Sequence, residues 1–197
     1  MRASLPTQSA AMDQASSIPT SISAAEAAQG LGSAQEALPE ASILSRPYVQ
    51  VRVQTDDFQI DHLLAALRRD RPKIGAIACF VGTVRDLNQG DSVSYMFLEH
   101  YPGMTEQSLQ AIAHQALERW QLEAVSIVHR IGLLAPLDQI VAVLTASAHR
   151  HDAFASCEFV MDFLKTEAPF WKKERIGGQD RWVQARDSDE AARKRWL

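Results

Sequence analysis

Pairs of strand-like segments alternate with single amphipathic helical stripes in this sequence, and that order constrains its fold more than any other feature. Two β-rich runs, 74–85 and 92–100, lie between the first and second stripes, and a short loop should join them as a hairpin. Two more runs, 124–131 and 139–148, lie between the second and third stripes. Single strands between helices favour a parallel sheet, whereas paired strands favour antiparallel pairing. The sequence therefore predicts an α+β fold with three helices and a mostly antiparallel sheet, in the order β-α-β-β-α-β-β-α-β-β.

Apolar spacing and turn residues set the limits of these elements. The first helix shows apolar residues at i, i+3, i+4 and i+7 over 60–67, and Asp56 or Asp57 is placed to cap it. Asp152 is placed in the same way before the third helix, which should end near Lys165. The remaining expected elements are a strand over 48–54, a helix over 109–120, and a last hairpin of 170–176 and 181–186 with Trp171 and Trp182 packed across it.

The first 46 residues have a different composition from the rest. They are rich in Ala, Ser, Gln and Pro, contain no aromatic residue, and show no sustained strand pattern. Such a segment cannot bury enough apolar surface to offset the entropy of ordering it. We therefore expect residues 1–46 to be a disordered, low-complexity extension and residues 47–197 to form one domain.

Composition narrows the classes of function. The chain of 197 residues has a formal net charge of -4, which argues against general binding to nucleic acid or anionic membranes. No apolar run approaches the roughly 20 residues that a membrane-spanning helix needs. The two cysteines, Cys79 and Cys157, lie in apolar runs without metal-binding spacing. We expect both thiols to be buried and inert and the protein to be cytoplasmic.

The segment 164–174 concentrates positive charge around a chain break. It contains Lys165, Lys172 and Lys173, and Pro169 between them cannot continue a helix. Lys165 should therefore end a helix while Lys172 lies on the following strand, so that two ammonium groups can converge on one anion. Between residues 165 and 186, six basic and three acidic side chains give a local charge of +3 on an otherwise negative chain.

Two other basic segments stand at junctions between elements. Thr83-Val84-Arg85 ends a strand, and His149-Arg150 precedes a helix whose free N–H groups favour an anion. These residues also have ordinary structural explanations. Arg85 can be a solvated strand end, Lys165 a cation at a helix C-terminus, and His149 a packed histidine. No P-loop, dinucleotide-binding or zinc pattern is present, so we expect no metal and no cofactor. We expect the remaining histidines to be structural or exposed: His100, His114, His129 and His151.

From about residue 48 to residue 196 the chain resembles the large, catalytic subunit of molybdopterin synthase. Several specific segments carry the resemblance in one order. They are F-V-G-T-V-R at 80–85, L-E-H-Y-P-G-M-T at 98–105, H-R-I-G at 129–132, S-A-H-R at 147–150, M-D-F-L-K-T-E-A-P-F-W-K-K-E at 161–174 and R-W-V at 181–183.

The resemblance implies a fold, a reaction and partners. The family fold is an α/β hammerhead, and two large subunits form a dimer within a heterotetramer that has a small ubiquitin-like subunit at each end. The thiocarboxylate at the small subunit's Gly-Gly terminus donates sulfur twice to cyclic pyranopterin monophosphate, which gives the dithiolene of molybdopterin. Two alternatives are a non-catalytic scaffold that binds a Gly-Gly tail and a nucleic-acid-binding module built on the last hairpin.

The resemblance also implies roles for individual residues. Lys165 and Lys172 correspond to catalytic positions. The positions that correspond to the substrate pocket are Thr83, Val84, Arg85, His149, Arg150, Lys173, Glu174 and Arg186.

Overall fold

A computed structural model describes residues 46–88, 91–183 and 187–197, all within the unit Ser45–Leu197. The extension predicted over residues 1–46 lies almost wholly outside these residues, as does Arg186. The described elements are β1 (Tyr48–Gln54), α1 (Ile60–Arg68), β2 (Ala76–Thr83), β3 (Leu87–Asn88), β4 (Asp91–His100), α2 (Met104–Arg119), β5 (Leu122–Arg130), β6 (Gly132–Leu134), β7 (Gln139–Ser147), α3 (Arg150–Glu167), β8 (Phe170–Ile176), β9 (Gln179–Val183) and α4 (Asp187–Lys194).

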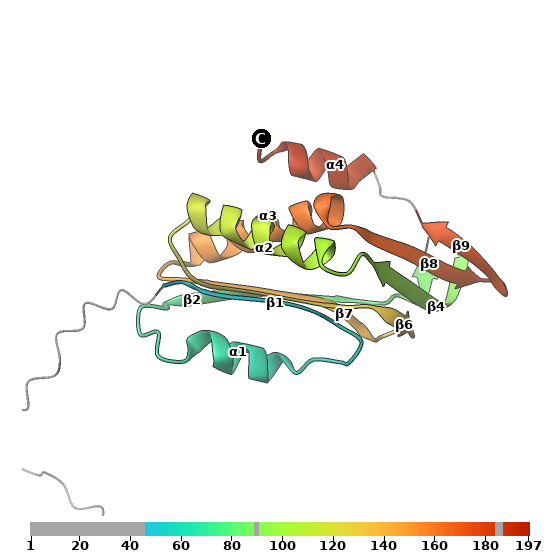
Figure 1. Cartoon of the computed structure of the whole chain (residues 1–197), viewed down its shortest axis with the longest axis horizontal. Coiled ribbons are helices and arrows are strands. Elements are labelled where there is room, and N and C mark those ends of the chain that lie inside the picture. Colours follow the sequence, from blue (N-terminus) through green and yellow to red (C-terminus); the bar gives the residue numbers. More distant parts are fainter. Residues whose placement is uncertain (1–45, 89–90, 184–186) are drawn as a thin grey trace, which may run out of the picture. The chain divides into compact units, whose positions relative to one another are not determined.

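The first sheet has the strand order β1-β5-β7-β2, and helices cover both of its faces. β1 runs parallel to β5, whereas β5–β7 and β7–β2 are antiparallel. Figure 1 shows α2 and α3 on one face of this sheet and α1 on the other. Phe159 of α3 is fully buried, and Trp120 packs edge-on against its ring. The predicted α+β class and the mostly antiparallel pairing are confirmed.

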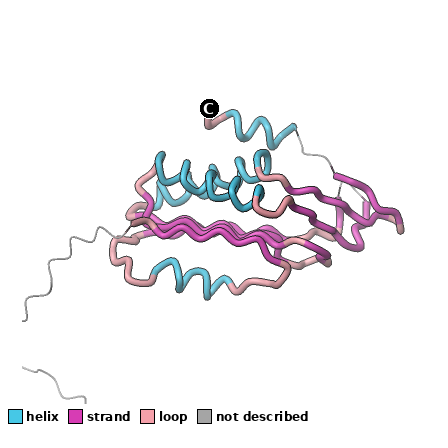
Figure 2. Tube along the Cα trace, viewed as in Figure 1, coloured by secondary structure: helices cyan, strands magenta, loops and turns pink. Residues whose placement is uncertain are grey.

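The second sheet has the order β3-β4-β8-β9, with β6 also paired to β4. Figure 2 shows these strands continuing beyond the ends of α2 and α3. The two sheets meet at a small buried cluster formed by Val84, Met96, Leu98 and Leu134, with Ile140 packed against it. This junction between the sheets lies beside the cavity described below.

The hairpin predicted from 74–85 and 92–100 is wrong, because the two strands belong to different sheets. β2 pairs with β7, and β4 pairs with β8. The chain leaves the first sheet at Val84, whose N–H donates to the carbonyl of Asp138. The two-residue strand β3 then turns back onto the start of β4 and forms the hairpin instead.

Both predicted helix caps are also wrong. α1 is capped by Gln59 without a side-chain hydrogen bond, because the carboxylate of Asp57 instead accepts the N–H of Phe58 and the side-chain amide of Gln139. α3 begins two residues before Asp152, with His149 in the capping position. Asp152 still lies in the first turn of α3, where a negative charge favours the helix dipole.

A fourth helix, α4, was not predicted. Its sequence is strongly polar and none of its residues is buried, so no apolar periodicity marks it. It is held to α3 by groups near and beyond its C-terminal end. Arg193 pairs with Glu167, and the indole N–H of Trp196 donates to Asp162 at 2.8 Å. The ring of Trp196 also packs edge-on against Phe159.

The cysteine prediction is right for Cys157 and wrong for Cys79. Cys157 is buried in the core, whereas Cys79 is exposed. β2 is the edge strand of its sheet, and α1 packs over β5 and β7 instead, which leaves Cys79 exposed among the described residues. Among the described helices, none combines the length and apolar character needed to cross a bilayer.

Candidate active site

A cavity of about 670 Å³ lies between the C-terminal end of α3, the end of β2 and the strand β8. The charged side chains that line it come from four separate parts of the chain. They are Arg85, Lys165, Lys172, Glu174 and Asp189, and Thr83 lies beside Arg85 at the same wall.

The break at Pro169 places the two predicted catalytic lysines on different elements, as the sequence indicated. α3 ends at Glu167, and its C-cap, Ala168, has an extended backbone with φ −77° and ψ 125°. A residue before proline favours this conformation, so the helix stops and β8 begins at Phe170. Lys165 lies in the last turn of the helix, and Lys172 lies on β8. Both side chains line the same cavity.

A buried carboxylate holds Lys172. The Nζ atom of Lys172 is 2.9 Å from Oε1 of Glu174, whose side chain is only 2% exposed. The two residues are separated by two positions on a strand, so their side chains lie on the same face. Burial of a carboxylate is costly unless it is paired and hydrogen-bonded, so the buried Glu174 strongly favours keeping this contact. Glu174 therefore fixes the ammonium group of Lys172 at the cavity wall.

Lys165 has a weaker partner on the unpredicted helix α4. Its Nζ atom lies 3.7 Å from Oδ1 of Asp189, and about half of the Lys165 side chain is exposed. An exposed ion pair at this separation contributes little to stability. Lys165 is thus free to move toward a bound anion.

Thr83 and Arg85 line the cavity, but the side chain of Val84 between them does not. Val84 is 1% exposed and packs at the junction of the two sheets. Its N–H donates to the carbonyl of Asp138, and its carbonyl accepts the N–H of Leu137, both at 2.9 Å. Val84 therefore anchors the segment whose neighbours reach the cavity.

Three predicted substrate residues lie away from this cavity in a single chain. Lys173 is on the opposite face of β8 from Lys172, with its Nζ atom 4.8 Å from the centre of the Trp182 ring. His149 and Arg150 stand at the start of α3, whereas Lys165 is in its last turn. Fifteen residues of α-helix separate Arg150 from Lys165 by about 22 Å.

Trp171 and Trp182, predicted to pack across the last hairpin, do not stand directly opposite each other. Trp182 stands opposite Lys173 on β8, and Trp171 stands opposite Glu99 on β4. Both indole side chains are about half exposed. The ring of Trp182 also lies under the Lys173 ammonium group.

His129 contributes to the cavity wall and was expected only to be structural or exposed. It lies at the end of β5, is 5% exposed, and stacks on Phe170 with ring centres 3.8 Å apart. Its Nδ1 atom is 2.8 Å from the carbonyl of Arg130, and a carbonyl only accepts, so Nδ1 carries the proton. Burial disfavours the charged form and lowers the pKa of His129 to about 4.

The cavity suits an anion, because its cationic side chains outnumber its carboxylates. Three cationic groups, from Arg85, Lys165 and Lys172, face two carboxylates. The imidazole beside them is neutral at physiological pH. In the described part of the chain, no three His, Cys, Asp or Glu side chains gather in a way that would hold a metal ion.

Comparison with known proteins identifies the family. The sequence model of the MoaE protein family matches residues 53–167, which is more than half of the chain. The chain belongs to the MoaE family. The match includes Thr83, Arg85 and Lys165, and it ends five residues before Lys172.

Individual relatives match a larger share of the chain than the family model does. The molybdopterin synthase catalytic subunit of Ralstonia nicotianae is 57% identical over 74% of this chain and 83% of its own length. The solved molybdopterin biosynthesis MoaE protein of Burkholderia ambifaria is 61% identical, with a TM-score of 0.66 over 75% of this chain and 97% of its own. A Helicobacter pylori chain, from a complex of subunits 1 and 2 of molybdopterin-converting factor, has a TM-score of 0.56 over 70% of this chain and 91% of its own. At 18% identity, that third likeness is one of fold alone.

Proposed function

We propose that this cavity is the active site at which the chain acts as the catalytic subunit of a molybdopterin synthase. The reaction is the transfer of two sulfurs from the C-terminal thiocarboxylate of a small ubiquitin-like subunit to cyclic pyranopterin monophosphate. One observation carries the assignment of the site: Lys165 and Lys172, on either side of Pro169, line a single cavity together with Arg85.

The charges of the reactants explain why cations are needed. The acceptor carries a cyclic phosphate and the donor carries a thiocarboxylate, so the reaction brings two anions together. Two like charges 4 Å apart repel by about 4 kcal/mol in a partly desolvated site. Positive groups fixed in advance offset that repulsion and stabilise charge that develops in the transition state.

The individual side chains suit different parts of this task. Arg85 offers a planar fork of N–H donors that matches a phosphate. The ammonium group of Lys172 is held by Glu174 and can donate a proton or a hydrogen bond at a fixed place. Lys165 is less constrained and can follow the thiocarboxylate tail as it enters. Thr83 adds a hydroxyl beside Arg85.

The remaining predicted residues need a second copy of the chain, or lie outside this cavity. His149 and Arg150 are too far from Lys165 to reach the cavity of their own chain. We propose that they contribute to the cavity of a second large subunit in a homodimer, within a heterotetramer that includes two small subunits. A role in substrate binding for Lys173 and Arg186 stays a prediction. We place the reaction in the cytoplasm, in keeping with the two free cysteines.

Alanine variants of the two lysines test the site. We expect Lys165→Ala and Lys172→Ala each to slow single-turnover sulfur transfer by about 100-fold or more, the usual contribution of a positioned acid–base group. Lys73→Ala is the control and should react like the wild type, because Lys73 is exposed and precedes the start of β2, whereas Thr83 and Arg85 lie at the end of that strand. The measurement uses the thiocarboxylated partner and follows the pterin product by mass spectrometry.

The outcomes separate the proposed enzyme from its alternatives. Wild-type rates in both lysine variants would overturn the assignment of the active site. A wild-type chain that binds the partner's tail and transfers no sulfur would be a scaffold. Salt-sensitive retention of RNA or DNA in a gel shift would instead favour a nucleic-acid-binding module.

A further inference from the structure

Arg130 joins three segments of the chain, one of which, the start of β7, pairs with Thr83 of the cavity wall. It is the last residue of β5, and its side chain is 11% exposed. Its Nε atom donates to the carbonyl of Thr55 at 3.2 Å, and Nη1 donates to the carbonyl of Gln139 at 3.0 Å. Nη1 also lies 3.5 Å from Oδ1 of Asp57. One guanidinium group therefore links the loop after β1 to the start of β7.

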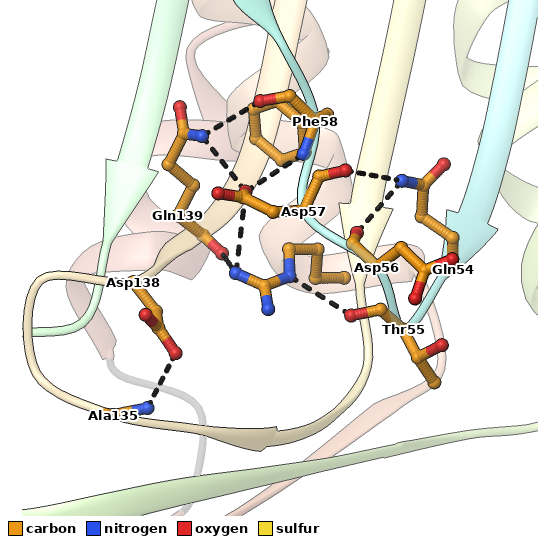
Figure 3. A network of polar contacts seen from close by, with 9 residues as sticks. Gln54, Thr55, Asp56, Asp57, Phe58, Ala135, Asp138 and Gln139 are labelled. Atoms are coloured by element: carbon orange, nitrogen blue, oxygen red, sulfur yellow. Dashed lines mark hydrogen bonds and ion pairs between the residues drawn. The ribbon is translucent and has the colours of Figure 1, made fainter.

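Asp57 and Gln139 complete this connection, as Figure 3 shows. The Oδ1 atom of Asp57 accepts the N–H of Phe58 and the side-chain amide of Gln139, both at 2.9 Å. The same amide donates to the carbonyl of Phe58 at 2.9 Å. We call Arg130, Asp57 and Gln139 the Arg130 clamp.

The clamp continues into the turn that precedes β7. The N–H of Ala135 donates to the carboxylate of Asp138 and closes this turn (Figure 3). Leu137, within the turn, adopts a positive φ of 76°. The backbone of Leu137 and Asp138 then makes the two hydrogen bonds that hold Val84. An unbroken path of hydrogen bonds and peptide links thus runs from Arg130 through Gln139 to Val84.

The side chain of Arg85 depends on that backbone for its position. Arg85 is exposed, and within the described residues its guanidinium group makes no hydrogen bond or ion pair. β2 also leaves its regular register between Gly82 and Thr83, so the sheet itself does not fix the segment after it. The two backbone hydrogen bonds of Val84, the residue before Arg85, therefore hold the backbone from which the Arg85 side chain extends.

We propose that the Arg130 clamp is a positioning device for Arg85, acting through the 135–138 turn and Val84. The inference rests on the proposed function, in which Arg85 binds the phosphate of the acceptor. Arginine suits this task because its donors point in different directions and so reach two carbonyls and a carboxylate at once. A lysine at this position keeps the charge but cannot span the same acceptors.

Arg130→Lys is the first test, in the full chain with the thiocarboxylated partner. We expect KM for the pterin substrate to rise about tenfold while kcat stays within about twofold, because losing these hydrogen bonds loosens a group that binds the substrate and leaves the reacting groups in place. Gln139→Met keeps the length of the side chain and removes both of its donations, and it should shift KM in the same direction. Arg119→Lys is the matched control, since Arg119 donates to a distant carbonyl, that of Trp196, at 2.8 Å.

A double variant shows whether the effect passes through Arg85. Arg85→Ala alone should raise KM, and adding Arg130→Lys to it should raise KM no further, because the group that the clamp positions is already gone. An equal additional rise in the double variant would overturn the proposal, since Arg130 would then act independently of Arg85. An unchanged KM in both Arg130→Lys and Gln139→Met would overturn it as well.

Hydrogen exchange at Val84 tests the clamp without any catalytic readout. We expect the amide of Val84 to exchange about tenfold faster in Arg130→Lys than in the wild type or in Arg119→Lys, because its hydrogen bond opens more often. Unchanged exchange would contradict the clamp even in an active enzyme. A wild-type protein that makes no product would instead count against the proposed function, and the exchange measurement would still decide whether the clamp exists.

Discussion

The buried imidazole of His129 makes the stability of this protein depend on pH in a predictable direction. Burial, and to a smaller degree the charge of His100, lower the pKa of His129 from 6.5 to about 4, while its hydrogen bond to the carbonyl of Arg130 opposes that change. Between these two values the unfolded chain binds a proton at this site and the folded chain does not. The free energy of unfolding therefore falls as the pH falls below 6.5, and the loss is complete only below the folded-state pKa.

The two pKa values give the size of the effect. The full gap between them corresponds to about 3 kcal/mol. Between pH 7 and pH 5, where most but not all of the unfolded chains gain the proton, the loss from this one site is about 2 kcal/mol. That is a substantial part of the 5–15 kcal/mol that stabilises a typical domain.

His129→Asn isolates this contribution, because the asparagine amide can still donate toward the carbonyl of Arg130 but does not titrate. Urea denaturation, followed by tryptophan fluorescence at pH 7 and pH 5, measures the free energy of unfolding. We expect the wild type to lose about 2 kcal/mol more than His129→Asn over this range. His151→Asn is the control, since His151 is 87% exposed, and it should lose as much as the wild type. Equal losses in the wild type and in His129→Asn would refute the reasoning, as would an imidazole NMR titration of His129 above pH 6.

Two further predictions concern single groups at and beside the cavity. Glu174→Gln keeps the shape of the buried side chain and removes the charge that holds Lys172. The kcat for sulfur transfer should therefore fall about tenfold or more, while the control Lys73→Ala stays at the wild-type rate. An unchanged kcat in Glu174→Gln would show that another group positions Lys172. Exposed Cys79 should react with a maleimide in the native protein, whereas Cys157, buried and with its pKa raised by burial to about 11, should react only after unfolding. Two labels on the native protein would contradict the burial of Cys157.

The parts of the fold that the sequence predicted correctly depend on local chemistry. Pro169 disfavours the helical conformation at Ala168 through a local steric clash, and the Gly177-Gly178 turn closes the last hairpin with both residues at positive φ. The pairing of β2 was not predicted because alternation shows that a segment is a strand, not which strand it meets. α4 escaped prediction because Trp196, which anchors it, lies outside the helix and contacts Trp120, the C-cap of α2, and Phe159 of α3.

The sequence could predict the part of the candidate site whose residues lie on either side of Pro169 or on one strand. Lys165, Lys172 and Glu174 are brought together by the break at Pro169 and by the alternation of β8. The same alternation puts Lys173 on the other face, so the sequence already contained the signal that separates it from Lys172. The length of α3 likewise separates Arg150 from Lys165 within one chain. The role of Asp57 in the Arg130 clamp had no such signal, because its contacts depend on how β1, β5 and β7 meet.

Direct detection of sulfur transfer tests the central claim most sharply. The wild-type chain is mixed with a small partner that ends in a Gly-Gly thiocarboxylate and with cyclic pyranopterin monophosphate, without any other sulfur source. Mass spectrometry then follows both the pterin and the partner's C-terminus. We predict a pterin that has gained two sulfurs, with two partner tails converted from thiocarboxylate to carboxylate for each. A pterin without sulfur, in the presence of a bound and intact thiocarboxylate tail, would contradict the account.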